Sequence, residues 1–368
     1  MNELPPMDVA GRVERLRAAL AGAGCDALVV TNLVNIRYLT GFTGSAGMLL
    51  VGEDDLLLVT DGRYRFQSTE QLAAAGVAAR IEIGTLPEQK DVVAASAAAI
   101  PRVGLEATNV TWARQRSFAA EWFPAAELVP TENVVEALRR VKDAGELARM
   151  AAAAKVADDA LAEVKPLLLD GITEAEFALA LDFEIRQLGA AGNSFETIVA
   201  SGPNGAKPHA RPSDRRIEKG ELVVLDFGAI VDGYCSDMTR TVCVGEPAHP
   251  TLRRMVEVVA ASQAAGVAAV RAGVTCKAVD DVCRDVIGEA GWRDAFMHST
   301  GHGVGLDIHE APYVATTSPD TLAAGHVVTV EPGVYLAEHG GVRIEDTVVV
   351  TDDGCYPLTN TPKDLIVA

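Results

Sequence analysis

Four acidic residues in the second half of the chain lie inside or directly after apolar, strand-like runs. They are Asp226, Asp237, Glu331 and Glu345. A carboxylate without a partner is costly to bury in such surroundings. Four carboxylates at one place repel each other unless cations compensate, and two divalent ions would neutralise their formal charge. The set therefore predicts a centre that holds two metal ions.

Taken singly, each of these acids could be a turn former or the end of a strand. A hairpin signal argues against that interpretation for the first two. Asp232-Gly233 is typical of a two-residue hairpin turn, which places Asp226 opposite Thr239. Asp237 then lies diagonally from Asp226 on the same face of the sheet. At that separation the two carboxylates can reach one ion.

Histidines gather in one segment of the same region. His298, His302 and His309 are three of the seven histidines in the chain. Glycines on both sides of His302 permit the close backbone approach that a crowded site needs. A lone histidine is usually structural, but three beside a carboxylate cluster favour metal or substrate contact. The sequence has neither an H-E-x-x-H zinc helix nor a G-x-S-x-G elbow, which argues against a mononuclear zinc protease and a serine hydrolase.

The chemistry-bearing residues recur in order along an internal repeat with an offset of roughly 100 positions. The matched pairs are Gly171-Ile172-Thr173 with Gly273-Val274-Thr275, Gly189 with Gly288, Gly192 with Gly291, His209 with His309, Asp226 with Glu331, and Asp237 with Glu345. An ordered series of this kind predicts two copies of a helix-then-strands unit, related by a pseudo-twofold axis. Corresponding residues should meet where the two copies face each other.

The elements before this region predict a separate domain. Residues 8 to about 130 alternate helix-like and strand-like patterns, including two apolar runs around the turn at 52–55. No cluster of acids, histidines or cysteines occurs there, so this domain is expected to shape or assemble the enzyme. Asp143 and Glu146 have the spacing of a capping box that starts a new helix. We therefore expect an N-terminal domain over 1–132 and a catalytic domain over 133–368.

Composition restricts the partners and the compartment. The 368 residues carry a formal net charge of -19, which disfavours nucleic acid and anionic membranes as partners. No uncharged apolar run approaches the length of a membrane span, and the first residues do not resemble a secretory signal. The six cysteines are scattered without a Cys-x-x-Cys pair, as expected of reduced thiols. A cytoplasmic protein is expected.

These motifs resemble the aminopeptidase P, prolidase and methionine aminopeptidase group, which has the pita-bread fold. The resemblance covers essentially the whole chain and rests on DFG followed by SDMTRT, on HSTGHGVGLDIHE, on VEPGVY and on GVRIED. NIRYLTGFTGS is similar to the creatinase-type N-terminal domain, which methionine aminopeptidases lack. The implied fold class is an α/β N-terminal domain followed by an α+β pita-bread domain with a pseudo-twofold internal repeat.

The resemblance also implies a ligand set. Asp226 would bind one metal ion, Asp237 and Glu345 would bridge both ions, and His302 with Glu331 would complete the other. Oxygen ligands with one imidazole suit Mn, Co, Fe or Zn, and two manganese ions are expected. A water that bridges the ions would attack the scissile carbonyl while the ions stabilise the oxyanion.

Roles besides metal binding are implied by the same motifs. Glu331 would also shuttle the proton. His209 and His309 match histidines that contact the substrate and steady the transition state. Arg343 and His298 match residues of the substrate pocket in proline-specific members.

The expected activity is hydrolysis of the bond between an N-terminal residue and proline, in small peptides with proline at the second position. A homodimer is expected. Whether the substrate is an Xaa-Pro dipeptide or a longer peptide stays open. Two other functions are considered: a non-catalytic binding protein on the pita-bread fold, and a creatinase-like C–N hydrolase. Relatives of both kinds lack the metal ligands that this sequence contains, so finding bound metal would separate them from the peptidase.

Overall fold

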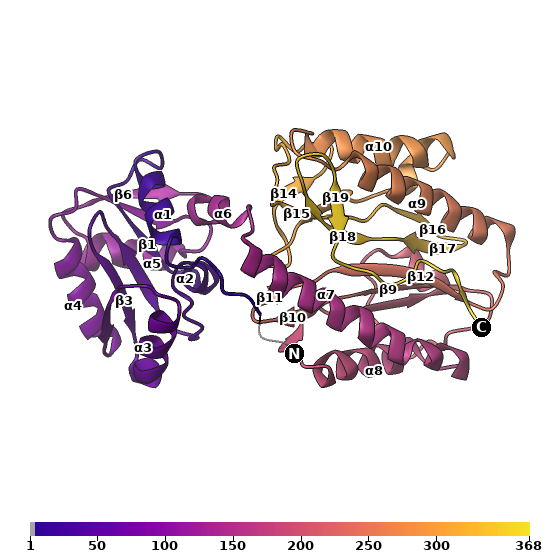
Figure 1. Cartoon of the computed structure of the whole chain (residues 1–368), viewed down its shortest axis with the longest axis horizontal. Coiled ribbons are helices and arrows are strands. Elements are labelled where there is room, and N and C mark those ends of the chain that lie inside the picture. Colours follow the sequence, from indigo (N-terminus) through magenta and orange to yellow (C-terminus); the bar gives the residue numbers. More distant parts are fainter. Residues whose placement is uncertain (1–3) are drawn as a thin grey trace. The chain divides into compact units, whose positions relative to one another are not determined.

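The computed structural model describes residues 4–368. The chain forms two compact units, Pro6–Arg139 and a second unit that contains Arg140–Ala368 (Figure 1). Within residues 4–368, no helix has both the length and the apolar character needed to cross a membrane.

The first unit is built on a six-stranded mixed sheet of order β4-β3-β2-β1-β5-β6. Its strands are β1 (Ala27–Val30), β2 (Met48–Val51), β3 (Leu56–Thr60), β4 (Arg80–Ile83), β5 (Arg102–Glu106) and β6 (Glu127–Thr131). Its helices are α1 (Arg12–Leu20), α2 (Leu33–Thr40), α3 (Arg65–Ala74), α4 (Leu86–Ala97), α5 (Trp112–Ser117) and α6 (Val134–Arg139). The expected hairpin is confirmed, because β2 and β3 pair antiparallel with Val51 opposite Leu56.

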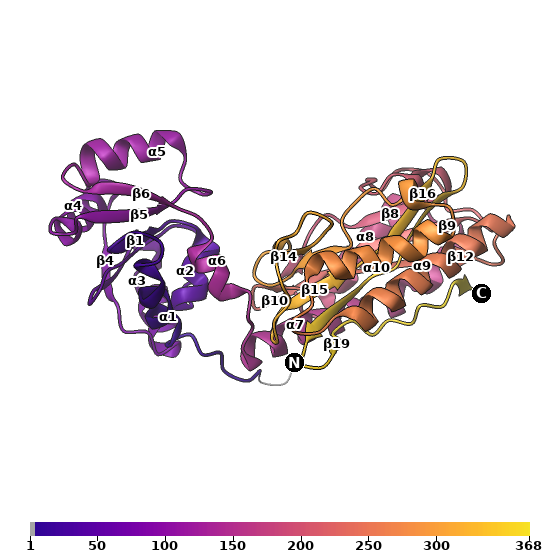
Figure 2. The same cartoon turned by 90° about the horizontal axis from the view of Figure 1, so that it is seen from above.

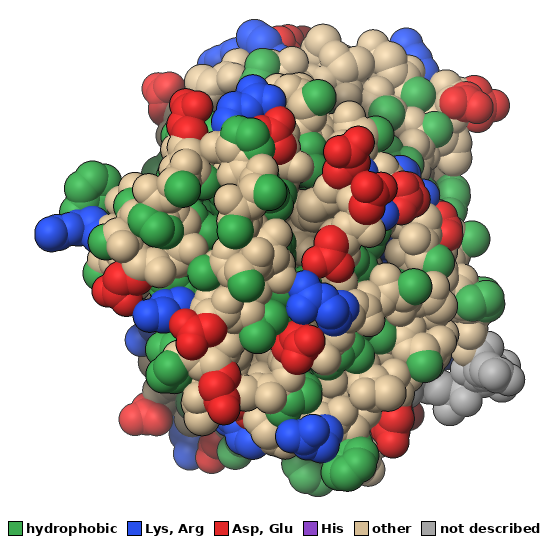
Figure 3. All heavy atoms as spheres, turned by 90° about the vertical axis from the view of Figure 1, so that its left-hand side faces the viewer, with side chains coloured by type: hydrophobic (Ala, Val, Ile, Leu, Met, Phe, Trp, Pro, Cys, Tyr) green, Lys and Arg blue, Asp and Glu red, His purple; other side chains and the backbone are tan. Residues whose placement is uncertain are grey.

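Helices cover the sheet of the first unit because its central strands are buried on both faces. All residues of β1, β2 and β3 are buried. α4 packs Val93 and Ala97 into the core of this sheet, and α1 lies on the other side (Figure 1). The face shown in Figure 3 carries interspersed acidic, basic and apolar side chains, as is typical of a solvated surface.

The second unit places β-sheets between two pairs of helices, α7 with α8 and α9 with α10 (Figure 1). In Figure 2, α9 and α10 lie side by side. These helices are α7 (Ala144–Val164), α8 (Glu174–Gln187), α9 (Pro250–Ala269) and α10 (Cys276–Glu289). The strands are β7 (Gly192–Asn193), β8 (Ile198–Ser201), β9 (Leu222–Phe227), β10 (Ala229–Val231), β11 (Tyr234–Cys235), β12 (Met238–Val244), β13 (Gly301–Gly303), β14 (Glu310–Val314), β15 (Val327–Val330), β16 (Gly333–Leu336), β17 (Gly340–Arg343), β18 (Asp346–Val350), β19 (Cys355–Pro357) and β20 (Ile366–Val367).

Local signals in the sequence determine where these helices begin. The predicted capping box is confirmed, since Asp143 and Glu146 cap each other's backbone at the start of α7. Thr173 and Thr275 each cap the helix that opens one repeat copy, α8 or α10.

One pairing within the predicted repeat is corrected by the structure. Gly288, matched to Gly189 in the sequence, lies inside α10. The structural counterpart of Gly189 is Gly291. Both follow the end of a helix with positive φ, at 100° and 87°, a backbone conformation that glycine adopts without a steric penalty.

The hairpin that positions the first two acids has the predicted register. Asp232 and Gly233 both have positive φ, as a type I′ turn requires. β9 and β12 pair antiparallel with Asp226 opposite Thr239. The sequence prediction for this hairpin is therefore confirmed.

The two repeat copies meet through hydrogen bonds between residues at the start of β12 and residues at the start of β18. The Thr347 hydroxyl donates to the Asp237 carbonyl oxygen at 2.8 Å, and the Glu345 backbone N–H donates to the Thr239 carbonyl oxygen at 3.1 Å. These bonds place Asp237 of the first copy beside Glu345 of the second copy.

A buried histidine before β15 predicts acid sensitivity of the fold. Burial lowers the pKa of His326 to about 4, and its Nδ1 accepts from the Ala323 N–H at 3.2 Å. The unfolded chain, with a histidine pKa of about 6.5, binds the extra proton first. Stability from this residue is therefore complete above pH 6.5 and is lost as the pH falls toward 4.

We expect His326→Asn, which keeps an acceptor for Ala323, to reduce this loss. Between pH 7.5 and 4.5 the free energy of unfolding should fall by about 2 kcal/mol less in the variant than in the wild type. Urea unfolding of both proteins in chelator at the two pH values measures the difference. Equal losses would show that His326 does not titrate in this window.

Candidate active site

One cavity in the second unit contains every site residue expected from the sequence. Its volume is about 490 Å³. The expected residues that line it are His209, Asp226, Asp237, His298, His302, His309, Glu331, Arg343 and Glu345. Phe195, Glu196, Arg211 and Tyr313 also line the cavity, and the sequence analysis did not identify them as site residues.

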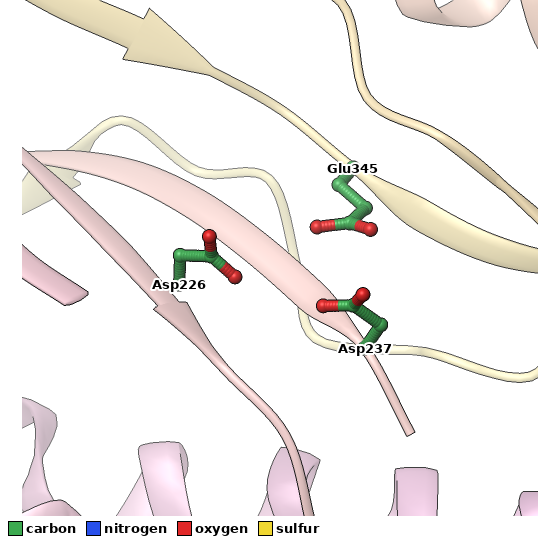
Figure 4. A group of neighbouring side chains, drawn as sticks. All are labelled: Asp226, Asp237 and Glu345. Carbon is green, nitrogen blue, oxygen red and sulfur yellow. The ribbon is translucent and has the colours of Figure 1, made fainter. Parts of the chain in front are cut away.

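Three carboxylates converge in this cavity from three segments. Asp226 comes from β9, Asp237 precedes β12 and Glu345 precedes β18 (Figure 4). One oxygen atom of each lies within 4.8 Å of the other two. Asp226 Oδ1 and Glu345 Oε1 are buried and have no hydrogen-bond partner within residues 4–368. Buried oxygens without a donor are rare in proteins, and two of them within one carboxylate cluster fit a cation beside them.

The electrostatics of the cluster agree with a cation site. Burial raises the pKa of Asp237 well above its usual value, and the charges of Glu345 and Asp226 raise it further. Burial, followed by the charges of Glu331 and Asp226, does the same for the pKa of Glu345. These groups resist carrying their charges together in the absence of metal. Divalent cations would reverse that cost, so the residues present fit a metal centre.

His302 faces the same cluster from β13. Its Nε2 lies 3.4 Å from Asp237 Oδ2 and 3.3 Å from Glu331 Oε1. The backbone carbonyl of Gly303 lies 2.9 Å from Nδ1, so Nδ1 carries the proton and Nε2 is available as a ligand atom. Burial opposes protonation of this ring, but Glu331 outweighs it and raises the pKa of His302.

Glycine before His302 is required by a close approach of two strands. A Cβ atom on Gly301 would lie 2.0 Å from the carbonyl oxygen of Thr329. The His302 N–H donates to the Thr329 hydroxyl at 3.0 Å. This packing fixes the backbone of His302 independently of the loop that follows it.

Arg343 is the permanent cation of the cluster and is buried. Its Nη2 pairs with Asp226 Oδ2 at 2.5 Å, and its Nη1 donates to the Tyr335 hydroxyl at 2.7 Å. Its Nε donates to the Thr239 hydroxyl at 3.0 Å, which in turn donates to Glu345 Oε2 at 2.7 Å. Arg343 therefore orients two carboxylates of the cluster, besides lining the cavity.

Thr239 and Tyr335 are site residues that the sequence analysis did not identify. The predicted register opposite Asp226 already placed Thr239 beside the cluster. A sequence signal for Tyr335 is the glycine opposite it: Gly341 is its strand partner in the β16–β17 hairpin. A Cβ atom on Gly341 would lie 1.9 Å from the Gly205 carbonyl oxygen and 2.8 Å from the Tyr335 ring, so the glycine is needed by the Gly205 backbone and also leaves room for the aromatic side chain.

Besides His302, three histidines line the cavity, namely His209, His298 and His309. His209 and His309 are exposed, whereas His298 is half-buried. The His309 ring contacts the His302 ring at a centroid distance of 4.3 Å. His298 Nε2 lies 2.8 Å from the Tyr335 hydroxyl. Burial lowers the pKa of both His298 and His309.

A buried glutamate fixes the loop that carries His209. Glu174, at the start of α8, accepts from the Ser201 N–H at 2.7 Å and from the Ser213 hydroxyl at 2.6 Å. These two serines flank the loop on either side. The N-terminus of a helix stabilises the buried negative charge.

The second repeat copy uses Asp280 in α10 for a similar purpose. Asp280 accepts from the Thr300 N–H and hydroxyl at 3.0 and 2.8 Å. It also pairs with Arg284, whose Nη2 donates to the His298 carbonyl oxygen at 2.5 Å. The backbone on both sides of Ser299 is thereby fixed to α10.

An α/β unit followed by a duplicated α+β unit, with buried carboxylates and an imidazole around one cavity, defines a metal-dependent hydrolase of the pita-bread type. Residues 148–352 match Metallopeptidase family M24, and residues 12–141 match the Creatinase/Prolidase N-terminal domain. The chain belongs to metallopeptidase family M24.

Its relatives resemble it along their whole length. An uncharacterised peptidase, YqhT, of Bacillus subtilis (strain 168) is 42% identical over 356 residues, which are 97% of this chain and 99% of the relative. The structure of an Xaa-Pro dipeptidase from Bacillus anthracis has a TM-score of 0.92 at 40% identity, covering 98% of this chain and 100% of that chain. An X-Pro aminopeptidase from Thermotoga maritima MSB8 has a TM-score of 0.88 at 34% identity, covering 97% and 100%. The expected family and fold are confirmed.

Proposed function

We propose that this chain is an Xaa-Pro peptidase that hydrolyses the bond between an N-terminal residue and proline with the help of two divalent metal ions. The convergence of Asp226, Asp237 and Glu345, with two buried oxygens that have no donor within residues 4–368, carries the proposal. Relatives named Xaa-Pro dipeptidase and X-Pro aminopeptidase, similar over nearly the whole chain, support the substrate class. The catalytic domain of this proposal is 133–368, and 1–132 is its N-terminal domain.

The proposed ligands are the four acids and His302. Asp226 would bind one ion, Asp237 and Glu345 would bind both, and His302 with Glu331 would complete the second. The 3.3 Å separation of His302 Nε2 and Glu331 Oε1 supports the pairing of the last two. Manganese is the proposed metal, and Co, Fe or Zn would also suit oxygen ligands with one imidazole.

When bound, the ions would supply an activated water and would polarise the scissile carbonyl. Glu331 accepts a proton from the attacking water and passes it on to the leaving proline nitrogen. His209 and His309, both exposed to the cavity, hold the peptide and donate to the developing oxyanion. His298 and Arg343, linked through the Tyr335 hydroxyl, shape the pocket for proline.

The substrate length, the compartment and the assembly belong to the same proposal. A cavity of about 490 Å³ accommodates a small peptide. All six cysteines are free, in keeping with a reducing cytoplasm. A homodimer is proposed, and light scattering of the purified protein checks it.

An activity assay with defined peptides tests the function. Purified protein should hydrolyse Xaa-Pro or Xaa-Pro-Yaa, lose this activity on exhaustive chelation and regain it with Mn²⁺ or Co²⁺. The relative rates on the two peptides decide between a dipeptidase and an aminopeptidase. Matched Xaa-Ala peptides are the control and should be poor substrates. Full turnover by chelated protein would refute the metal mechanism, and preference for Xaa-Ala would refute the substrate class.

A further inference from the structure

A buried ion pair lies next to the cavity but belongs to none of the proposed ligand or substrate contacts. Lys142 Nζ and Glu310 Oε1 are 2.8 Å apart, with 1% and 8% of their side chains exposed. A buried pair of this kind is rarely retained for stability, because apolar residues of similar size often stabilise a protein as well. The pair is therefore a candidate for positioning a neighbouring segment of the chain.

Glu310 directly follows His309 and fixes the turn that carries it. Gly303 is the strand partner of Glu310 in the β13–β14 pairing. A Cβ atom on Gly305 would lie 2.0 Å from Glu310 Oε1, so the carboxylate lies against the backbone of Gly305. The loop between Gly303 and Glu310 is therefore closed over the Glu310 side chain.

Lys142 is itself held firmly at the start of the second unit. Its backbone N–H donates to the Gly325 carbonyl oxygen at 2.9 Å, and the Gly325 N–H donates to the Val350 carbonyl oxygen at 3.0 Å. Lys142 Nζ also lies 3.4 Å from the Arg140 carbonyl oxygen. The ammonium group thus has a fixed place from which it can orient Glu310.

His309 depends on this loop more than His302 does. His302 is tied to Thr329 by its backbone N–H, whereas no hydrogen bond fixes the His309 ring within residues 4–368. Besides its contact with the His302 ring, the His309 imidazole is therefore placed in the cavity by the backbone that Glu310 holds.

We propose that Lys142 and Glu310 are positioning residues that hold the loop 304–309 in the shape that presents His309 to the substrate. The expected effect of the pair on turnover rests on the proposed function. The expected effect of the pair on the conformation of the loop does not depend on that function.

The test compares Lys142→Met with the double variant Lys142→Met/Glu310→Met. The single variant leaves a buried carboxylate without its ammonium group and should unfold at a lower temperature. The double variant replaces the pair by apolar side chains and should recover most of the melting temperature. In the double variant kcat for Xaa-Pro should still be about 10- to 100-fold below the wild type, with KM and metal content little changed.

Hydrogen exchange provides a readout besides activity. The Gly305 N–H, which donates to the Asp307 carbonyl oxygen at 3.0 Å, should exchange at least about 10-fold faster in the double variant. Arg140→Met is the matched control: it removes a half-buried pair with Asp320 and should leave both kcat and this exchange rate unchanged.

A double variant with wild-type kcat, or with unchanged Gly305 exchange, would overturn the inference and leave the pair with a purely structural role. If the wild type failed to hydrolyse any Xaa-Pro peptide, the proposed function would fall. The exchange measurement would then still support or overturn the holding of the loop.

Discussion

Asp237→Asn and Glu345→Gln should each lower kcat/KM for an Xaa-Pro peptide by roughly 10⁴-fold or more, because the rate depends on water activated by both ions. Each of these carboxylates is assigned to both metal ions, and their oxygens lie within 4.8 Å of each other and of Asp226. Metal content measured on dialysed protein should fall with activity. Two ions per chain in either variant would contradict the assignment.

The melting temperature of metal-free protein provides a second, independent test of this assignment. In chelator, Asp237→Asn should melt at the same temperature as the wild type or higher, because it removes one charge from a cluster in which burial and neighbouring carboxylates already raise the pKa values. Added Mn²⁺ should raise the melting temperature of the wild type and not that of the variant. A purely structural Asp237 predicts the opposite, namely a variant that is less stable in chelator.

His209→Ala and His309→Ala should lower kcat by a factor on the order of 10² to 10⁴ while metal content stays intact. Both side chains line the cavity and are exposed, so their removal deletes a contact with the peptide or the developing oxyanion and little packing. The melting temperature should therefore change little. Metal analysis, kcat and thermal unfolding on the same preparations provide the comparison.

His339→Ala is the matched control for the two histidine variants. The His339 ring stacks on His249 at 5.1 Å and does not line the cavity, so kcat should remain at the wild-type value. Unchanged kcat with lower stability in His209→Ala or His309→Ala would make those residues structural. Loss of metal in either variant would instead make that histidine a ligand.

The resemblance expressed by the sequence motifs gave the family and the fold, and the comparisons confirm both. Local chemistry accounts for the further predictions that proved correct. The Asp143–Glu146 capping box and the Asp232-Gly233 turn depend on residues a few positions apart, so their geometry is encoded within each segment. The turn also fixed the register that puts Asp226 opposite Thr239.

The pairing of Gly189 with Gly288 shows where such local reasoning fails. Spacing alone did not distinguish a glycine inside a helix from one that ends it. The positive φ of Gly291 decided the matter.

The sequence by itself determined that His209, His309 and the four acids share one cavity, because an ordered repeat brings corresponding positions to a shared centre. The motif resemblance added His298, His302 and Arg343. Only the tertiary structure decided how they are held. Arg343 pairs with Asp226 across 117 positions, and Lys142 pairs with Glu310 across 168. Charged side chains have many possible partners along a chain, and desolvation selects one only after the surrounding elements have packed. Such contacts have no periodic or local signature in the sequence. The ion pairs that hold the site residues in place could therefore be identified only from the tertiary structure.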